Sequence, residues 1–581
     1  MTVGLVTPPS DAAPTPAGGS GRRPTVVEIV TVVVGAVFAA TLLYALAGLV
    51  AEILVESGGN PLAPYADALA LPGTAKVVVD TVVVVTLSTL CALVIAVGFA
   101  WLNERTNARL GFVAAFLPLI PLLVPTLAST IGWVFLAADR AGILNVLLRD
   151  WFSFLGLSSD TGPLNIYSMP GMVFLYTLNI VPFVYLPVSA ALSRLDPALD
   201  EASRVSGVGP VRTLFRVTIP AIRPAVAGGL LLGIAVGLAT FSVGVIIGAG
   251  SRIDVLAVRI YNLLTQGFPP QTAEAVALST FLLFTVLIVS TLQRRVIARG
   301  AHATIGGKGV GSAVVDLGWG RWVARSVMVL FVALSSVIPL LGLLYISLTG
   351  NWQPSLTLRG LSLDSYTAVL AENPMTSTAL RNSVLLAVVG GLATLVAATL
   401  IAIFVAQRPG RTSTLLDGLA KAPGGLSHLV LAIALLIAFS GPPFRFGTSL
   451  GILFLAFLVF FMPQAYVSAS SAHAQLSTEL GEASLISGAG PVRTLVRVTL
   501  PLMMPGLVGG AIILFVLIMS EVTGSALLAG PRTPVVGFVM LDLWANGTFS
   551  TIAALGVVMT AISTAVAMVL LWVGRTGISR S

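Results

Sequence analysis

Long runs of apolar residues alternate with short polar stretches along most of the 581-residue chain. Each run reaches about 20 residues, the length that an α-helix needs to cross the hydrocarbon of a bilayer. Because the runs are continuous and do not alternate in polarity, they predict membrane helices and not the strands of a β-barrel. Twelve spans are expected, at residues 25–51, 79–101, 110–137, 169–192, 225–248, 271–292, 326–348, 382–406, 415–439, 449–472, 506–528 and 550–573.

The composition agrees with a membrane protein and argues against several other classes. Hydrophobic residues make up 56% of the chain and charged residues 9%, against roughly 25% charged residues in a soluble domain. Cys91 is the single cysteine, and His302, His428 and His473 show no metal-ligand spacing, so no metal, redox site or cofactor is expected. The net charge of +8 comes from thinly spread basic residues without interleaved aromatics, which does not indicate a nucleic-acid partner.

The distribution of Lys and Arg predicts the orientation of the chain. With a cytoplasmic N-terminus, 21 of the 31 basic residues fall in cytoplasmic segments and nine fall on the opposite side. This bias follows the positive-inside rule and predicts a multi-pass protein of the cell membrane with both termini in the cytoplasm. The apolar run after Arg22 and Arg23 is longer than the core of a signal peptide, which favours a permanent helix.

A polar segment occurs twice between the apolar runs. Residues 201–220 and 482–501 agree at 15 of 20 positions when they are aligned at an offset of 281. Six spans in each half mean that both copies enter the membrane in the same direction, as parallel repeats. Simple solvation of a basic loop would not require the same alanine, glycine and proline at the same spacing. The repeat therefore favours one kind of cytoplasmic partner that docks at two equivalent sites.

The local chemistry of each segment predicts a short helix, a turn and a second helix. In the first copy an aspartate-proline pair at Asp196 is a helix start, and Gly207 can adopt the positive φ that ends this helix. Pro210 is expected to begin the second helix. Pro220, and Pro501 in the other copy, are expected to break the second helix before the next span.

Both segments resemble the Glu-Ala-Ala signature of the permeases of binding-protein-dependent ABC importers. In that signature Glu-Ala-Ala is followed by Gly after three residues, and by two aliphatic residues and Pro after nine more. The residues that match it are Glu201, Ala202, Ser203, Gly207, Val217, Ile219 and Pro220, and then Glu482, Ala483, Ser484, Gly488, Val498, Leu500 and Pro501. Serine replaces the second alanine in both copies, a small departure that close helix packing should tolerate.

The resemblance implies an all-α type I ABC importer fold in which two permease domains, each a six-helix repeat, are fused in one chain. It implies that the matching residues form coupling helices, which dock two copies of a cytoplasmic ATPase subunit. An extracytoplasmic solute-binding protein would deliver the solute. The sequence around Lys308 lacks the residues of a complete phosphate-binding loop. ATP hydrolysis is therefore expected on a separate subunit, and the chain itself is not expected to be an enzyme.

The spans and the resemblance together predict how the chain is divided. The resemblance covers residues from about 80 to 290 and from about 380 to 572. The expected segments are a disordered cytoplasmic tail (1–24), a first helix with an extracytoplasmic loop (25–78), a first transmembrane domain (79–292), a cytoplasmic linker (293–325), a seventh helix with a loop (326–380), a second transmembrane domain (381–573) and a cytoplasmic tail (574–581).

Glu521 is the candidate for a residue of the translocation pathway. It lies within the eleventh predicted span, where a carboxylate is costly unless a cavity or a partner compensates it. The alternative is a hydrogen-bonded structural glutamate. Thr240 occupies the equivalent position in the first half, so any site would be asymmetric. Lys76, Asp80 and His428 are expected to be interfacial or packing residues.

The cargo is not fixed by the sequence. The stretch that begins at Asp254 is similar to the same region of ferric-iron and thiamine importers, and polyamine, phosphonate and sulphate importers share the layout. Ferric iron or another small polar or charged nutrient is therefore expected. An ion-coupled secondary transporter with two parallel halves would match the spans but not the repeated segments. A membrane scaffold would explain docking but not twelve spans with proline-rich interruptions.

Overall fold

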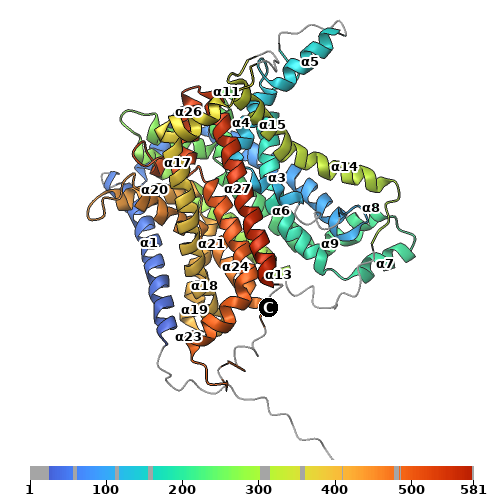
Figure 1. Cartoon of the computed structure of the whole chain (residues 1–581), viewed down its shortest axis with the longest axis vertical. Helices are drawn as coiled ribbons and strands as arrows, with labels where there is room; N and C mark the ends of the chain where they lie inside the picture. The colour runs from blue at the N-terminus through green and yellow to red at the C-terminus, as the bar shows by residue number, and fades with distance from the viewer. Residues whose placement is uncertain are drawn as a thin grey trace, which may run out of the picture.

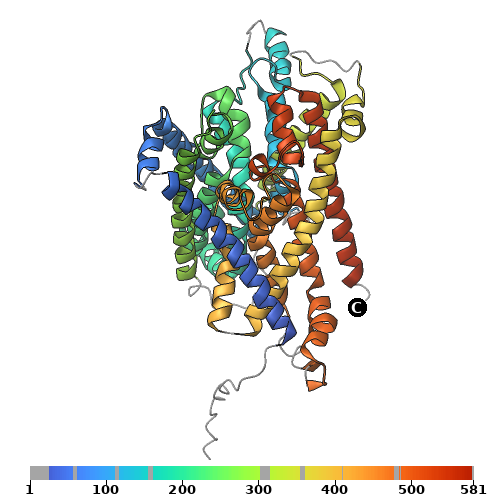
Figure 2. The ribbon, with the colours of Figure 1, turned by 90° about the vertical axis from the view of Figure 1, so that its left-hand side faces the viewer.

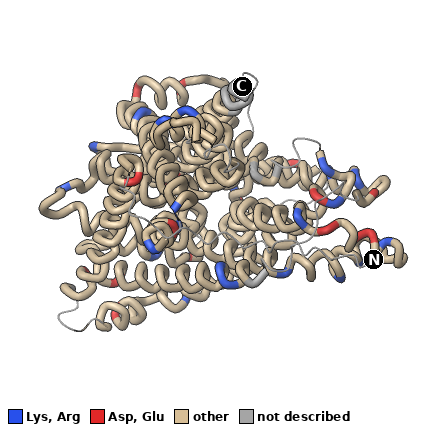
Figure 3. The backbone as a smooth tube through the Cα atoms, turned by 90° about the horizontal axis from the view of Figure 1, so that it is seen from below, with Lys and Arg blue, Asp and Glu red and all other residues tan. Residues whose placement is uncertain are grey.

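The computed structural model describes residues 25–56, 60, 62–110, 117–154, 161–300, 314–353, 360–408, 410–476, 483–484 and 486–578. Within these ranges the chain is helical, and its only β pairing consists of two isolated bridges. The all-α fold is therefore confirmed. Figure 2 shows that most of the long helices run roughly side by side. Charged residues interrupt them only at scattered points (Figure 3).

The helices fall into two sets on either side of the linker. The first set is α1 (Val26–Glu56), α2 (Ala63–Ala70), α3 (Thr74–Arg105), η2 (Leu117–Leu123), α4 (Thr126–Ala137), α5 (Ile143–Phe154), α6 (Met169–Arg194), α7 (Pro197–Val205), α8 (Pro210–Thr213), η3 (Leu214–Thr218), α9 (Ile219–Ala221), α10 (Arg223–Ala239), α11 (Ser242–Ser251), α12 (Leu256–Thr265) and α13 (Thr272–Gly300). The second set is α14 (Gly320–Val332), η4 (Ala333–Val337), α15 (Ile338–Thr349), α16 (Asp364–Thr367), η5 (Ala368–Glu372), α17 (Pro374–Leu385), η6 (Leu386–Gly390), α18 (Gly391–Gln407), α19 (Arg411–Lys421), η7 (Ala422–Gly425), α20 (His428–Ser440), α21 (Leu450–Ala474), α23 (Pro491–Thr494), η8 (Leu495–Thr499), α24 (Leu500–Met519), α25 (Ser525–Leu528), α26 (Val536–Ala545) and α27 (Phe549–Ile578).

The described residues contain fewer continuous spans than the twelve that the apolar runs predict. Nine helices are long and apolar enough to cross a bilayer, or up to eleven if each of two sharply bent pairs is one span. The run at 110–137 ends in α4, which has 12 residues, too few to cross the hydrocarbon alone. The run at 415–439 is a pair of helices bent by 108°.

Prolines explain both departures. Pro121 lies inside the 3-10 helix η2, and Pro125 precedes α4. In the second half, Pro423 lies in the 3-10 turn η7 where the bend occurs. Proline has no N–H to donate, and its ring clashes with the carbonyl of the preceding turn. An apolar run can therefore be long enough to span the bilayer and still fold as two shorter helices.

The first helix of each half packs against the opposite half. α1 lies along α18 and α20 of the second half (Figure 1), and Gly48 approaches Ala438 so closely that a Cβ atom would lie 3.3 Å from the Ala438 side chain. α15, in the second half, packs against α4 of the first half and α27 of its own. The two halves are therefore joined by exchanged helices as well as by the linker.

Hydrogen bonds between α4 and the α14–α15 segment satisfy carbonyls that a proline leaves without a helical donor. Pro339 cannot donate to the carbonyl of Ser335, and Ser129 Oγ donates to that carbonyl at 3.3 Å. The indole N–H of Trp133 donates to the carbonyl of Leu334 at 3.0 Å. In a bilayer no water can take this role, so the contact between the halves supplies the missing donors.

The same proline effect recurs along the chain as π-helical turns. Within the described residues there are five such turns, η3, η4, η5, η6 and η8. Four of them end two residues before a proline. In a π turn the N–H bonds reach one residue further back, as from Ile219 to the carbonyl of Leu214. The wider turn makes room for the proline ring and lets the helix continue.

Gly132 is the point at which α4 touches the backbone of α15. A Cβ atom there would lie 2.3 Å from the carbonyl oxygen of Pro339 and 2.9 Å from its Cα. We expect Gly132→Ala to force the halves apart and to destabilise the purified protein by about 1–3 kcal/mol, measured as a lower unfolding temperature in detergent. Gly98→Ala is the control and should not lower this temperature, because a Cβ atom at Gly98 would meet no neighbouring atom within 4 Å. Equal unfolding temperatures for the two variants would show that α4 and α15 do not pack as described.

Candidate functional site

The first repeated segment folds as predicted up to its second helix. We call residues 196–221 the first repeat loop. The Asp196 carboxylate accepts the N–H of Ala198 at 2.9 Å and so caps α7. Gly207 has a φ of 77° and directly follows the last turn of this helix. The N–H of Val208 then donates to the carbonyl of Ser203 at 3.1 Å, which closes a Schellman turn. α8 begins at Pro210, as expected.

The second repeated segment makes the same turn. We call residues 483–501 the second repeat loop; Glu482 lies outside the described residues. Gly488 has a φ of 82°, and the N–H of Ala489 donates to the carbonyl of Ser484 at 3.1 Å. α23 begins at Pro491. The two loops lie well apart, with α7 on the right flank of Figure 1 and α23 at its lower left.

The serine that departs from the signature has the same partner in both loops. Ser203 Oγ lies 2.8 Å from Thr213 Oγ1, and Ser484 Oγ lies 2.9 Å from Thr494 Oγ1. Each pair joins the helix before the glycine turn to the helix after it. Reasoning from the sequence treated the serine only as a small residue that the packing tolerates, and it did not predict this contact. The signal was present, because the threonine recurs at the same offset of 281 as the serine.

Each repeat loop also exposes apolar side chains at matching positions. Glu201, Ala202 and Ala483 are exposed as well, whereas Ser203 and Ser484 are half-buried. The matched apolar pairs, with their exposed fractions, are Val205 (90%) and Ile486 (87%), Val211 (60%) and Val492 (51%), and Phe215 (63%) and Val496 (56%). Residue identity changes at two of the three positions, but apolar character is kept. Exposed apolar groups that recur in this way mark a surface for a partner.

The expected break is confirmed in the first loop, just after Pro220, and wrong in the second loop at Pro501. Pro220 lies within α9, and the chain bends by 81° after it, where α10 begins at Arg223. Pro501 starts no break, because residues 491–519 form one continuous apolar helix. Both prolines lie at the first positions after a π turn, where the missing N–H is tolerated. Ile219 and Leu500 are half-buried beside them.

Glu521 lies where the helix of the eleventh span ends. α24 stops at Met519, and the Glu521 carboxylate accepts the N–H groups of Gly524 and Ser525 at 2.9 and 3.0 Å. The Ser525 hydroxyl also donates to it at 3.1 Å. Its side chain is 3% exposed, and His428 Nδ1 lies 3.7 Å from it. Glu521 therefore caps the short helix α25 from a buried position.

Thr240 lies at the equivalent interruption in the first half. α10 ends at Ala239 and α11 begins at Ser242. The Thr240 hydroxyl donates to the carbonyl of Val236 at 2.8 Å, and the Tyr176 hydroxyl donates to the Thr240 carbonyl at 3.1 Å. Both halves thus interrupt their helix at the same place. A carboxylate accepts N–H groups there in one half, and uncharged hydroxyls donate to carbonyls in the other.

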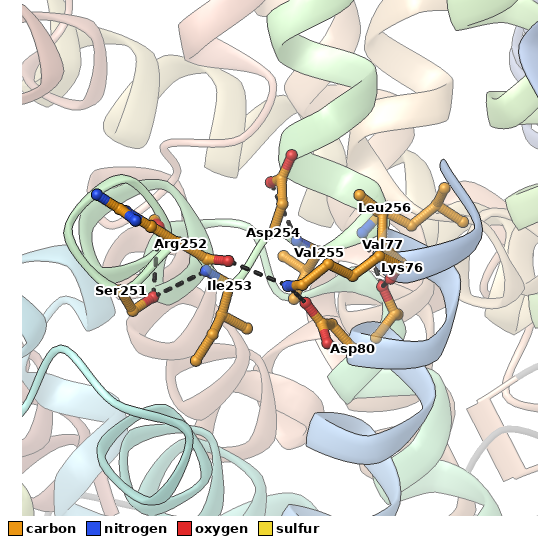
Figure 4. Close-up of polar contacts among 11 residues, drawn as sticks. Lys76, Val77, Asp80, Ser251, Arg252, Ile253, Asp254, Val255 and Leu256 are labelled. Carbon is orange, nitrogen blue, oxygen red and sulfur yellow. Dashed lines mark hydrogen bonds and ion pairs between the residues drawn. The ribbon is translucent and has the colours of Figure 1, made fainter. Parts of the chain in front are cut away.

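Charged side chains gather at the start of α3. Lys76 Nζ lies 2.6 Å from Asp80 Oδ2 and donates to the carbonyl of Arg252 at 3.1 Å (Figure 4). Asp254 accepts the N–H of Val255 at 3.1 Å, and burial raises the pKa of its carboxyl above the usual value. These contacts fasten the loop between α11 and α12 to α3. Within the ranges that the structure describes, no three His, Cys, Asp or Glu side chains are grouped to hold a metal ion.

Comparison with known proteins gives the identity of this fold. The model of the family "Binding-protein-dependent transport system inner membrane component" matches residues 81–299 and again residues 398–576. The chain belongs to this family. The two matches confirm the resemblance seen in the repeated segments, and with the helical fold they make the protein a fused double permease of the type I ABC kind.

Similar proteins are named as permease proteins of transport systems. This permease is 25% identical over 492 residues to the ferric transport system permease protein FbpB of Actinobacillus pleuropneumoniae, covering 84% of this chain and 70% of the relative. It is 25% identical over 445 residues to the putative ferric transport system permease protein FbpB 1 of Haemophilus influenzae, covering 76% and 68%. The spermidine/putrescine permease protein PotB of Haemophilus influenzae is 26% identical over 225 residues, which are 37% of this permease and 74% of PotB. The permease is thus a membrane subunit of a binding-protein-dependent ABC transporter.

The serine–threonine pairs give a direct test of the loop geometry. We expect Ser203→Ala with Ser484→Ala to loosen both loops, because each change removes a hydrogen bond of about 0.5–1.5 kcal/mol. Hydrogen exchange of residues 197–213 and 486–494 should become several-fold faster. Ser206→Ala is the matched control, since Ser206 Oγ donates only within its own helix, to the carbonyl of Ala202. Unchanged exchange in the double variant would contradict the role of these pairs.

Proposed function

We propose that this permease takes a solute from an extracytoplasmic binding protein and moves it into the cytoplasm, driven by ATP hydrolysis on two copies of an ATPase subunit. The observation that carries the proposal is the pair of repeat loops. They share a Schellman turn, a serine–threonine bond and three exposed apolar positions. A surface built twice in one chain suits two copies of one partner.

We propose that both repeat loops lie on the cytoplasmic side of the membrane, because Lys and Arg are in excess in the segments on that side. The exposed residues Glu201, Ala202 and Ala483 would then meet the ATPase, as would Glu482. Gly207 and Gly488 would hold the turn that presents them. The proposed division keeps residues 79–292 and 381–573 as the two transmembrane domains and 293–325 as the cytoplasmic linker.

Ferric iron is the proposed cargo, with another small polar or charged nutrient as the alternative. Two of the relatives that align with most of this chain are named as ferric transport permeases. PotB, a relative that aligns with about a third of the chain, is named for spermidine and putrescine. No side-chain cluster for a metal ion is formed by the described residues. We therefore propose that selection occurs mainly on the binding protein.

The pathway is proposed to run between the halves, beside α25. A cavity of about 310 Å³ lies there. It is lined from the first half by Leu264, Thr265, Pro270 and Thr272, and from the second half by Ile433, Leu436, Ile437, Ala526 and Leu527. Because Glu521 caps α25, it would fix the position of Ala526 and Leu527 in the cavity lining and place a carboxylate close behind them. Thr240 would be its uncharged counterpart.

A secondary carrier remains the rival function. Such a carrier needs an ionisable group in the bundle that changes protonation during transport, and Glu521 is the candidate. In the described structure this carboxylate accepts three hydrogen bonds that hold α25. The carrier hypothesis also does not explain why the two repeat loops have matching exposed surfaces. These two observations favour the ATP-driven importer.

The glycine turns test ATPase docking. We expect Gly207→Val with Gly488→Val to weaken ATPase binding and coupled hydrolysis at least ten-fold, because a β-branched residue at positive φ costs about 1–2 kcal/mol per site. Gly209→Ala with Gly490→Ala is the control, since these glycines have φ of −68° and −71° and open space around them. Pull-down and ATPase assays make the comparison. Full binding and coupled hydrolysis in the valine variant would refute docking at these loops.

The cap on α25 tests the proposed pathway. We expect Glu521→Gln to insert normally and bind its ATPase, but to transport about five- to ten-fold more slowly, equivalent to ~1 kcal/mol on the barrier. The reason is that an amide cannot replace a carboxylate that accepts from Gly524 and Ser525 together. Ser520→Ala, whose hydroxyl donates to the carbonyl of Val516, should transport normally. A wild-type rate in the glutamine variant would return Glu521 to a purely structural role.

A further inference from the structure

The linker between the halves returns to the first half before the second half begins. Val315 pairs with the end of α3: its N–H donates to the carbonyl of Arg105 at 2.9 Å, and its carbonyl accepts the N–H of Asn107 at 3.1 Å. This short parallel bridge lies directly before α14. Figure 1 shows α14 on the same flank of the molecule as α7 and α8.

Side chains reinforce this attachment. The Asn107 amide donates to the Asp316 carboxylate, and its oxygen accepts the N–H of Leu317 at 3.1 Å. The N–H of Gly318 donates to Asp316 at 2.9 Å. These donors hold the pKa of the Asp316 carboxyl below its usual value, so the carboxylate stays charged near neutral pH. Arg325, in α14, donates to the backbone of the same turn, at the Asn107 carbonyl.

The side chain of Arg105 points into the first repeat loop. It is 3% exposed, and its Nη2 donates to the carbonyls of Leu192 and Leu195 at 2.8 and 2.5 Å. Its Nη1 lies 3.5 Å from the Asp200 carboxylate. A buried charge of this kind is stable only when it is paired and hydrogen-bonded, and removing one partner is strongly destabilising.

Asp200 carries the connection across the loop. It belongs to α7 and is 4% exposed, and its other oxygen accepts the Thr218 hydroxyl at 3.0 Å. Thr218 ends the π turn η3 on the far side of the glycine turn. One continuous chain of contacts therefore runs from the linker through Arg105 and Asp200 to both arms of the first repeat loop.

The sequence of the second repeat lacks the carboxylate that carries this connection in the first. Gly481 stands at the position that corresponds to Asp200, and glycine offers no carboxylate. The arginine that directly follows α18, Arg408, forms a 2.7 Å ion pair with Glu28 of α1 instead. The two loops thus share a turn and an exposed surface but differ in what holds them.

We propose that Arg105 is a positioning residue that joins residues 315–318, at the end of the linker, to the first repeat loop, so that these two segments move as one body. The proposal rests on the ATPase-docking role proposed above for that loop. A displacement imposed on α7 would reach the linker and α14 through Arg105, and α15 would pass it to α4 across the interface of the halves. The second loop would lack this route and act on its own half alone.

The test compares variants at the two ends of this connection in the full-length protein in lipid nanodiscs. Asn107→Ala with Asp316→Ala removes the side-chain hydrogen bonds that hold the linker and leaves the buried pair and the backbone bridge in place. Arg105→Lys keeps the charge but removes the guanidinium fork. Glu28→Gln is the control, because it removes the ion pair with Arg408 on the other half. Hydrogen exchange is measured for residues 197–213 and 486–494, and solute moved per ATP is measured with the ATPase bound.

We expect the Asn107→Ala, Asp316→Ala protein to exchange about five-fold faster at residues 197–213, because it loses the three hydrogen bonds that Asn107 and Asp316 make with the linker turn. Exchange at 486–494 should be unchanged. Solute moved per ATP should fall several-fold while ATPase affinity stays within about two-fold, and Arg105→Lys should retain part of the wild-type ratio. Glu28→Gln should change neither hydrogen exchange at residues 197–213 nor the solute moved per ATP.

Equal exchange in wild-type and linker-released protein, or an equal rise in both loops, would overturn the proposal. So would an unchanged transport ratio with faster exchange, since that would make the joint merely structural. The exchange measurement needs no ATPase. If the wild-type permease fails to bind the ATPase, the docking function is refuted while the exchange result still decides whether Arg105 joins linker and loop.

Discussion

The architecture depends on the requirement that every backbone N–H and C=O group within a bilayer finds a partner inside the protein. Two of the interruptions in the described helices show such partners clearly. Ser129 supplies the donor that Pro339 removes, and Glu521 accepts the free N–H groups at the start of α25. The first of these contacts lies between the halves, and the second lies beside a cavity between them. These two interruptions therefore lie where the halves of the chain meet.

The chain uses one loop design twice but supports it in two ways. Both loops have a glycine at positive φ and a serine bonded to a threonine ten residues later. The first is bent by 81° from the helix that follows and is held by a buried arginine. The second continues directly into its membrane helix. Two loops with matching exposed surfaces are thus held by different contacts, which a fused chain permits because its halves need not be interchangeable.

Much of the local structure follows from the sequence, and most of the long-range contacts do not. The cap at Asp196 and the turn at Gly207 obey rules that act within a few residues, so they were predictable. Hydropathy could not reveal that Pro121 divides an apolar run, because it measures only how apolar a residue is and not whether its backbone has an N–H to donate. The contact of Arg105 with a carboxylate 95 positions away depends on how α3 packs against the end of α6. No periodicity in the sequence encodes that packing.

The energy source of transport tests the central claim most directly. Permease, ATPase and ferric-loaded binding protein are reconstituted in sealed vesicles, and uptake of labelled iron is followed with ATP present and the proton gradient collapsed by an ionophore. The account predicts that uptake requires ATP, requires both repeat loops to be intact, and continues at an undiminished rate without the gradient. Uptake by the permease alone, driven by an ion gradient in the absence of any ATPase, would contradict it.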